Sequence, residues 1–258
     1  MPSRLPTSPA CPRPATGPPS LVVALAGLGA MLLLAAGCGH DPADRAHLAA
    51  LEGQEKGLSI EQQMALVDQA ISLEPRRPAY YETRAGYWIA LRRFDRARSD
   101  LDRDIALVDR PYARFMRGLV ACQAGEFERS LADFDTAIAG QPSNTQFYRG
   151  RSLARAALGD AAGALEDAEH LVTEVPQQAE SWYARGVARA RLGRHLGAID
   201  DFDRAAALRP ELVYVVEARE KSLRRIGETG RALLDREWLA GARVEQAGCA
   251  PCLDPFRY

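Results

Sequence analysis

A period of 34 residues is the feature that most restricts how this chain can fold. Pro142, Pro176 and Pro210 are spaced 34 residues apart, and each closes a stretch with the apolar periodicity of a helix pair. Such repetition predicts identical two-helix units stacked in a row, because one unit alone cannot bury its apolar face. A glycine near the middle of each copy suits the positive φ of a turn between two helices, at Gly125, Gly159 and Gly193.

Composition favours helices over strands. Of the 258 residues, 47% are hydrophobic and only 7% are aromatic, and β-branched residues are sparse beside Ala, Leu, Arg, Asp and Glu. The 33 Lys and Arg residues are balanced by 34 Asp and Glu residues, so the formal net charge is −1. No basic surplus exists to neutralise a phosphate backbone. We therefore expect an all-α protein that does not bind nucleic acid.

The copy at residues 179–212 resembles the tetratricopeptide repeat. Six residues of that family's signature occur at the expected spacing, at Trp182, Gly186, Ala198, Phe202, Ala205 and Pro210. The resemblance implies an α-solenoid, a right-handed superhelix of helix-turn-helix hairpins, and a scaffold that binds other proteins. One departure recurs in every clear copy, where an arginine replaces the leucine of the signature.

The same register divides the chain. Clear repeats are expected at 78–110, 111–144, 145–178 and 179–212, within a superhelix over 46–243. A degenerate repeat at 44–77 precedes them, with its first helix over 46–56 and its second over 60–75. An end helix pair without a clear signature, at 213–243, shields the last repeat. Outside the superhelix we expect a signal peptide at 1–37, a linker at 38–45 and a C-terminal tail at 244–258.

Each arginine that replaces the signature leucine is followed sixteen residues later by an aspartate on the second helix. Because an unpaired charge partly out of water is costly, and a guanidinium fits a carboxylate in two places, we expect one ion pair per repeat. Recurrence in four repeats favours a scaffold role over a charged ladder that binds ligand. The pairs are Arg84–Asp100, Arg117–Asp133, Arg151–Asp167 and Arg185–Asp201.

By resemblance, positions 2, 5, 9 and 12 of each first helix face a ligand-binding groove. Here they are mostly apolar or aromatic, with isolated charges at Glu82, Arg149 and Glu180, which suits a docked peptide. The alternative is that the aromatic residues fill gaps between helices. The ninth positions lack the Lys and Asn with which some members hold a C-terminal carboxylate. Candidate groove residues are Glu82, Ile89, Tyr112, Phe115, Leu119, Arg149, Leu153, Tyr183 and Val187.

The N-terminus has the pattern of a bacterial lipoprotein signal. Residues 21–36 are uncharged and apolar, which is shorter than the roughly 20 residues of a spanning helix. The following Gly37-Cys38 completes a string that resembles the lipobox, whose cysteine carries diacylglycerol. We expect a lipid anchor at Cys38, in the outer membrane and facing the periplasm if the host is Gram-negative. An ordinary secretory cleavage site and an uncleaved anchor are the alternatives.

Groups for catalysis are not assembled in the sequence. The four histidines lack metal-ligand spacing, and no phosphate-binding glycine loop or nucleophile motif occurs, so we expect no enzyme activity and no cofactor.

Cys249 and Cys252 form a C-x-x-C in a tail with Gly and Pro, where a local disulfide is the simplest outcome. A thiol-redox or enzyme-accessory role is the alternative. The sequence thus predicts an envelope scaffold that binds peptide segments of other proteins and assists assembly.

Overall fold

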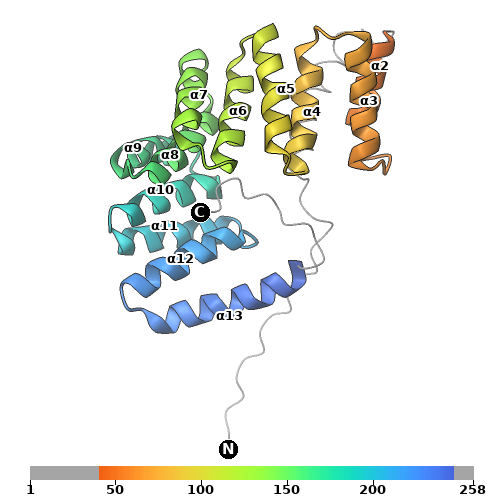
Figure 1. The fold of residues 1–258 in the computed structure, drawn as a ribbon. Helices are drawn as coiled ribbons and strands as arrows, with labels where there is room; N and C mark the ends of the chain where they lie inside the picture. Colours follow the sequence, from red (N-terminus) through yellow and green to blue (C-terminus); the bar gives the residue numbers. More distant parts are fainter. Residues whose placement is uncertain (1–40, 247–258) are drawn as a thin grey trace, which may run out of the picture.

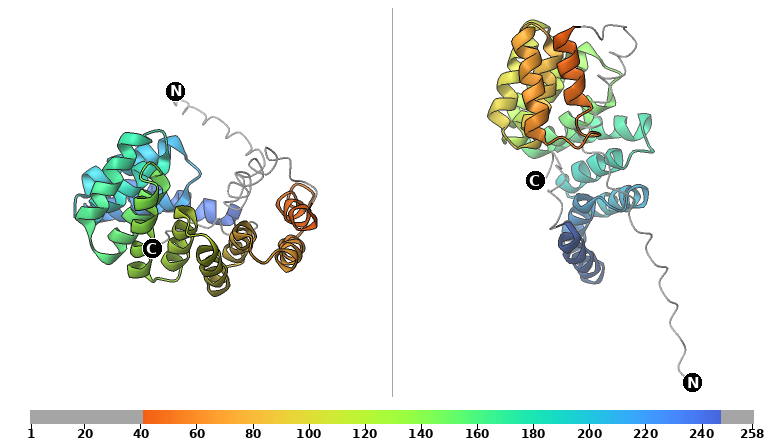
Figure 2. Two further views of the ribbon diagram at one scale, coloured as in Figure 1. Left: turned by 90° about the horizontal axis from the view of Figure 1, so that it is seen from above. Right: turned by 90° about the vertical axis from the view of Figure 1, so that its right-hand side faces the viewer.

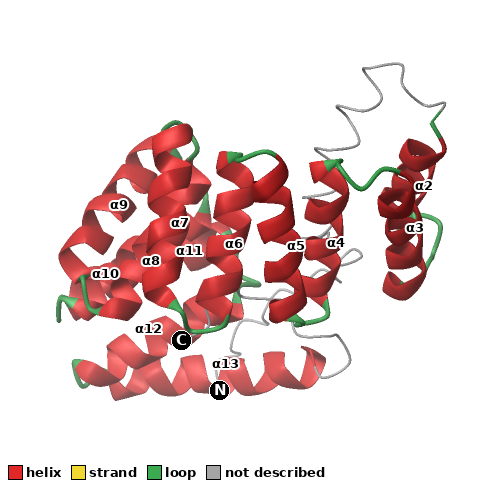
Figure 3. Ribbon diagram, turned by 45° about the horizontal axis from the view of Figure 1, so that its top comes forward, coloured by secondary structure: helices red, strands yellow, loops and turns green. Residues whose placement is uncertain are grey.

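The computed structural model describes residues 41–246, and every regular element within that range is an α-helix. Short loops join the helices (Figure 3). In chain order they are α2 (Pro42–Leu51), α3 (Ile60–Leu73), α4 (Pro78–Ala90), α5 (Phe94–Leu107), α6 (Pro111–Gln123), α7 (Phe127–Gly140), α8 (Thr145–Leu158), α9 (Ala161–Glu174), α10 (Ala179–Arg191), α11 (His195–Leu208), α12 (Val213–Arg225) and α13 (Thr229–Gln246).

The helices pair into hairpins that stack in an arc (Figure 1), and the view from above shows the same curvature (Figure 2). Within the stack, the second helix of each hairpin packs on the first helix of the next. Successive first helices also touch, from α6 to α8, α8 to α10 and α10 to α12, and no comparable contact joins successive second helices in the described range. The first helices therefore form the inner layer of the arc. The predicted all-α solenoid is confirmed.

The turn inside each hairpin has a left-handed backbone. The glycines expected there have positive φ, 77° at Gly125, 87° at Gly159 and 73° at Gly193. In the 78–110 repeat the equivalent residue is Arg92, with φ of 56°. A side chain at positive φ crowds the following carbonyl, so this turn is strained relative to the others.

Paired helices approach each other closely where the first helix has a glycine, which has no side chain. A Cβ atom added at Gly186 would lie 2.5 Å from the ring of Phe202, and one added at Gly118 would lie 2.7 Å from the ring of Phe134. Phe202 and Phe134 are 1% and 0% exposed and belong to the same core cluster. Each ring therefore fills the space that a glycine of the facing first helix leaves open.

The first hairpin departs from the expected boundaries. Helix α2 spans Pro42–Leu51, whereas the sequence predicted 46–56. The Asp41 carboxylate accepts a hydrogen bond of 2.8 Å from the Ala43 N–H, and Pro42 at the first helical position has the φ that a helix needs. These capping residues start the helix early, so residues 42–45 of the predicted linker belong to it.

Candidate protein-interaction site

The arginine and aspartate of each predicted pair lie in direct contact. The Nη2–Oδ1 distances are 2.6 Å for Arg84–Asp100 and Arg117–Asp133 and 2.7 Å for Arg151–Asp167 and Arg185–Asp201. In each pair Nε donates a second hydrogen bond to the same carboxylate. The aspartates are buried on the second helices, and the arginines reach them from the first. Each pair thus fastens the two helices of one hairpin.

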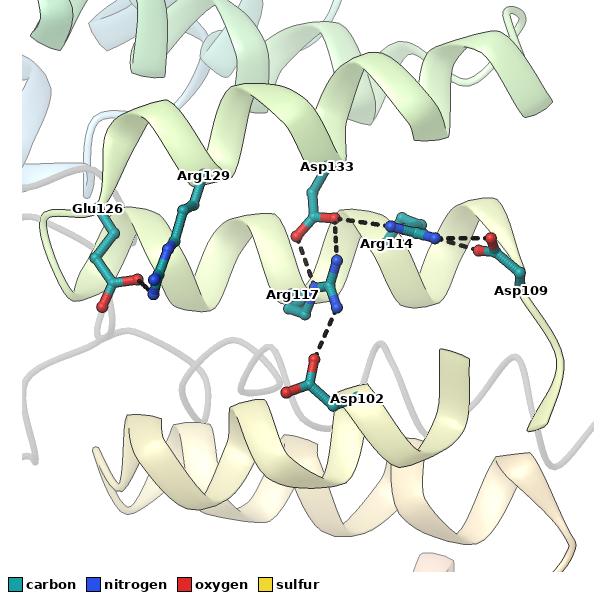
Figure 4. Close-up of polar contacts among 7 residues, drawn as sticks. All are labelled: Asp102, Asp109, Arg114, Arg117, Glu126, Arg129 and Asp133. Carbon is teal, nitrogen blue, oxygen red and sulfur yellow. Dashed lines mark hydrogen bonds and ion pairs between the residues drawn. The ribbon is translucent and has the colours of Figure 1, made fainter. Parts of the chain in front are cut away.

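Three of these arginines, Arg84, Arg117 and Arg151, also bind the preceding repeat. Nη1 of Arg117 lies 2.7 Å from Asp102 on α5 (Figure 4), and Nη1 of Arg84 lies 2.7 Å from Asp68 on α3. Arg151 reaches Asp135 on α7 in the same way, at 2.8 Å. In these three arginines all three guanidinium nitrogens, Nε, Nη1 and Nη2, are therefore occupied within the protein, which supports a scaffold role for the pairs rather than ligand binding.

A fifth pair was missed in the sequence. Arg219 on α12 lies 2.6 Å from Asp235 on α13 and 2.8 Å from Asp203 on α11. Both members stand 34 residues after Arg185 and Asp201, so continuing the register past residue 212 would have found them. The end helix pair therefore keeps the polar pairing of the repeats although it lacks their apolar signature.

Several candidate groove residues are in the core rather than on a surface. Phe115 and Leu153 are 2% exposed, and Leu119 and Tyr183 are 8% exposed. All four belong to the central core cluster, where Phe115 packs against the rings of Phe134 and Phe147. The expectation that they face a ligand is corrected, because they are packed in the core that adjacent helices share, as with Tyr183 against Phe202 of α11.

A narrower set stays partly exposed on the first helices. We call it the inner face: Glu82, Ile89, Tyr112, Arg149 and Val187, all half-buried. Glu82 accepts a hydrogen bond of 2.7 Å from Arg110, and Glu180, at the start of α10, accepts one of 3.0 Å from Arg209. These contacts neutralise two of the three charges that the sequence placed here.

An unexpected carboxylate lies beneath the inner face. Asp104 on α5 is 0% exposed and stands where later repeats have Ala137, Leu171 and Ala205. Both its oxygens accept from Nη2 of Arg110 at 2.9 Å. Burial raises the pKa of Asp104 to about 6, against the opposing effect of Arg110.

The remaining predictions concern metal binding, the membrane and the cysteines. Within residues 41–246, no group of His, Cys, Asp or Glu is placed to hold a metal ion. In the same range no helix is both long and apolar enough to cross a membrane. Cys38, Cys249 and Cys252 lie outside the described residues, as do the segment 1–37 predicted to be a signal peptide and most of the predicted tail at 244–258.

Family comparison agrees with the repeat geometry. One tetratricopeptide repeat model matches residues 115–179, and a second matches residues 179–212. Residues 115–212 carry tetratricopeptide repeats. A comparison with curated proteins found no match to the chain.

Solved structures share the fold at low sequence identity. A chain of the APC/C hetero-tetramer Cut9–Hcn1 matches with a TM-score of 0.72 and 13% identity, over 85% of this chain and 43% of that one. This chain therefore spans less than half of that relative. PilW, described as a type IV pilus biogenesis factor, matches with a TM-score of 0.68 and 17% identity, over 83% of this chain and 96% of its own. YrrB, described as a TPR protein with an unusual peptide-binding site, matches with a TM-score of 0.56 and 16% identity, over 74% of this chain and 97% of its own.

Proposed function

We propose that this tetratricopeptide repeat protein is a lipid-anchored scaffold of the bacterial cell envelope, which binds peptide segments of other envelope proteins and assists their assembly. The observation that carries the proposal is a continuous stack of hairpins with a partly exposed inner face of apolar and charged side chains. Such a surface suits an extended or helical peptide. The descriptions of YrrB as peptide-binding and of PilW as a pilus biogenesis factor support the same kind of role.

The anchor part of the proposal rests on the sequence around Cys38. Only residues 39–41 separate that cysteine from α2. Several acyl chains on one cysteine hold a membrane stably, whereas a single chain does so only marginally. A body joined through so short a segment would be held close to the membrane, which we propose to be the outer membrane on its periplasmic side.

Replacing the thiol tests the anchor. The variant Cys38→Ser should remove the acyl mass seen by mass spectrometry and block cleavage before residue 38, because that cleavage follows attachment of the lipid. The control Cys11→Ser, which lies before the expected cleavage site, should leave both unchanged. A Cys38→Ser protein whose acylation and cleavage match those of the unchanged protein would refute the lipid anchor at Cys38.

Site-specific photo-crosslinking tests peptide binding. A crosslinking residue in place of Gln146, an exposed residue at the second position of α8, should trap partner chains in intact cells. The same residue in place of Arg204, exposed on the second helix α11, is the matched control and should trap few. Equal adducts at both positions, or none at Gln146, would contradict binding on the inner side. Adducts lost on changing Cys249 and Cys252 to Ser would favour the thiol-redox alternative.

A further inference from the structure

We infer that Arg149 recognises an acidic side chain of the bound peptide, an inference that rests on the proposed function and names the chemistry of the partner. The starting observation concerns charge balance on the inner face. Glu82 is paired with Arg110, and Glu180 is paired with Arg209. Arg149 makes no hydrogen bond or ion pair to any carboxylate of the described residues, so one positive charge is left over.

The state of Arg149 differs from that of the other half-buried arginines on first helices. Arg84, Arg117 and Arg151 each bind two carboxylates, and Arg155 and Arg189 each bind one or more. By contrast, Nε of Arg149 is buried with no partner. Arg110 also has a buried Nε without a partner, but its Nη2 binds Asp104, so only Arg149 of these two lacks a carboxylate. A buried N–H without an acceptor costs about 1–3 kcal/mol in general, so a ligand that supplies an acceptor would gain by binding Arg149.

The surroundings of Arg149 strengthen any contact with an anion. Its counterparts at the same position of the neighbouring first helices, α6 and α10, are the core residues Phe115 and Tyr183. Both helices contact α8. Apolar neighbours lower the local dielectric, which makes a charge-assisted hydrogen bond worth more than it is in water. Tyr112 and Val187 on the inner face offer half-buried apolar contacts for residues beside the acidic one.

A side-chain carboxylate fits this site better than a chain terminus. One guanidinium binds a carboxylate through two parallel hydrogen bonds, so Arg149 can hold a side-chain carboxylate without help from a second positively charged residue. The ninth positions of the same first helices are Gly86, Leu119, Leu153 and Val187, so they add no amide donor or amine there. The partner is therefore an otherwise apolar peptide segment with an Asp or Glu inside it.

Selection from random peptides with amidated C-termini, using the full-length protein, tests the inference. The unchanged protein should enrich peptides with Asp or Glu at one fixed place between apolar residues. Arg149→Met should lose that acidic preference and bind the enriched peptides about tenfold more weakly, the loss typical of one hydrogen bond to a charged group. Arg149→Glu should instead enrich Lys or Arg at the same place. The control Arg191→Met, on the exposed end of α10, should select as the unchanged protein does.

The outcomes separate the two proposals. Peptides enriched without an acidic preference, or a preference that Arg149→Met retains, would overturn the role of Arg149 and leave peptide binding standing. Acidic preference that appears only when the peptides carry a free C-terminal carboxylate would also overturn it, in favour of terminus recognition. A protein that enriches no peptide, although circular dichroism shows it folded, would overturn peptide binding itself.

Discussion

Asp201 shows how much one buried carboxylate holds together. Asp201 lies on α11 and is 2% exposed. It accepts hydrogen bonds from two arginines of α10, Arg185 and, one turn further along that helix, Arg189. Both arginines are mostly buried, so neither regains full hydration if the carboxylate is lost. The carboxylate of Asp201 is therefore the shared ion-pair partner of two guanidinium groups.

Replacing Asp201 with Ala should destabilise the fold by about 2–4 kcal/mol, because it leaves two partly buried guanidinium groups without a partner. The free energy of unfolding, measured by urea denaturation, checks this. Asp200→Ala changes the adjacent, exposed residue of the same helix and should shift the value by less than about 0.5 kcal/mol. Equal effects of the two changes would show that the paired arginines are not dependent on Asp201.

His47 should make stability depend on pH. It is 2% exposed, its Nε2 contacts Thr83 Oγ1 at 2.8 Å, and its Nδ1 is buried with no partner. Burial lowers the pKa of His47 from 6.5 to about 4, although nearby Asp44 opposes the shift. As pH falls from 6.5 to 4, the unfolded chain takes up a proton that the folded chain does not, so stability falls. His47→Gln, which cannot titrate, should remove up to about 1.4 kcal/mol per pH unit from this slope.

Asp104 supplies a control of opposite sign. Its pKa is raised from 3.8 to about 6, so as pH falls from 6 to 3.8 the folded chain takes up a proton before the unfolded one. That uptake favours folding at lower pH. Asp104→Asn should therefore steepen the loss of stability on acidification, whereas His47→Gln should flatten it. Parallel slopes for both variants would contradict the assigned directions.

At the scale of elements, the hairpins were predictable because the repeat pattern specifies each helix several times. The turn glycines, the closing prolines and the polar pairs all give the same register, and the structure follows it. The start of α2 was not predicted, because the cap formed by Asp41 and Pro42 lies outside the periodic pattern. The exposure of Phe115 and Tyr183 was also not predictable from position within a helix, since it depends on how closely the next hairpin packs.

The strained turn at Arg92 offers a gain in stability. Arg92→Gly should stabilise the protein by about 0.5–1 kcal/mol, because glycine adopts a φ of 56° without the steric cost. Arg92 is exposed and its guanidinium lies 5.7 Å from the Phe94 ring, so little packing is lost. Thermal unfolding measures the change. Arg93→Gly, one residue later at a negative φ, is the control and should not stabilise; a gain there or none at residue 92 would contradict the argument.

At the scale of the whole molecule, the extensive helix–helix contacts within residues 41–246 join neighbouring hairpins, so stability is approximately a sum of local terms. The last hairpin covers Ile199 of the preceding one with Leu223 and Ala232. Its own outer side leaves Leu233, Leu234 and Trp238 54%, 66% and 43% exposed. The last hairpin thus covers the end of the stack. Among the described residues no further repeat follows it, so it is joined to the rest through its single interface with the preceding hairpin.

This asymmetry predicts different responses to core changes at the end and in the middle. Leu223→Ala, at a residue 1% exposed in α12, should cost about 2–4 kcal/mol and speed hydrogen exchange mainly in α12 and α13. Phe134→Ala should cost about 3–5 kcal/mol and speed exchange on both sides of α7, because that ring packs against Gly118 on α6 and Gly150 on α8. Exchange monitored by mass spectrometry separates the two patterns. If Leu223→Ala speeds exchange equally from α2 to α13, the chain unfolds as one cooperative unit. The additive description then fails, because a change in the last interface would alter the stability of hairpins that do not contact it.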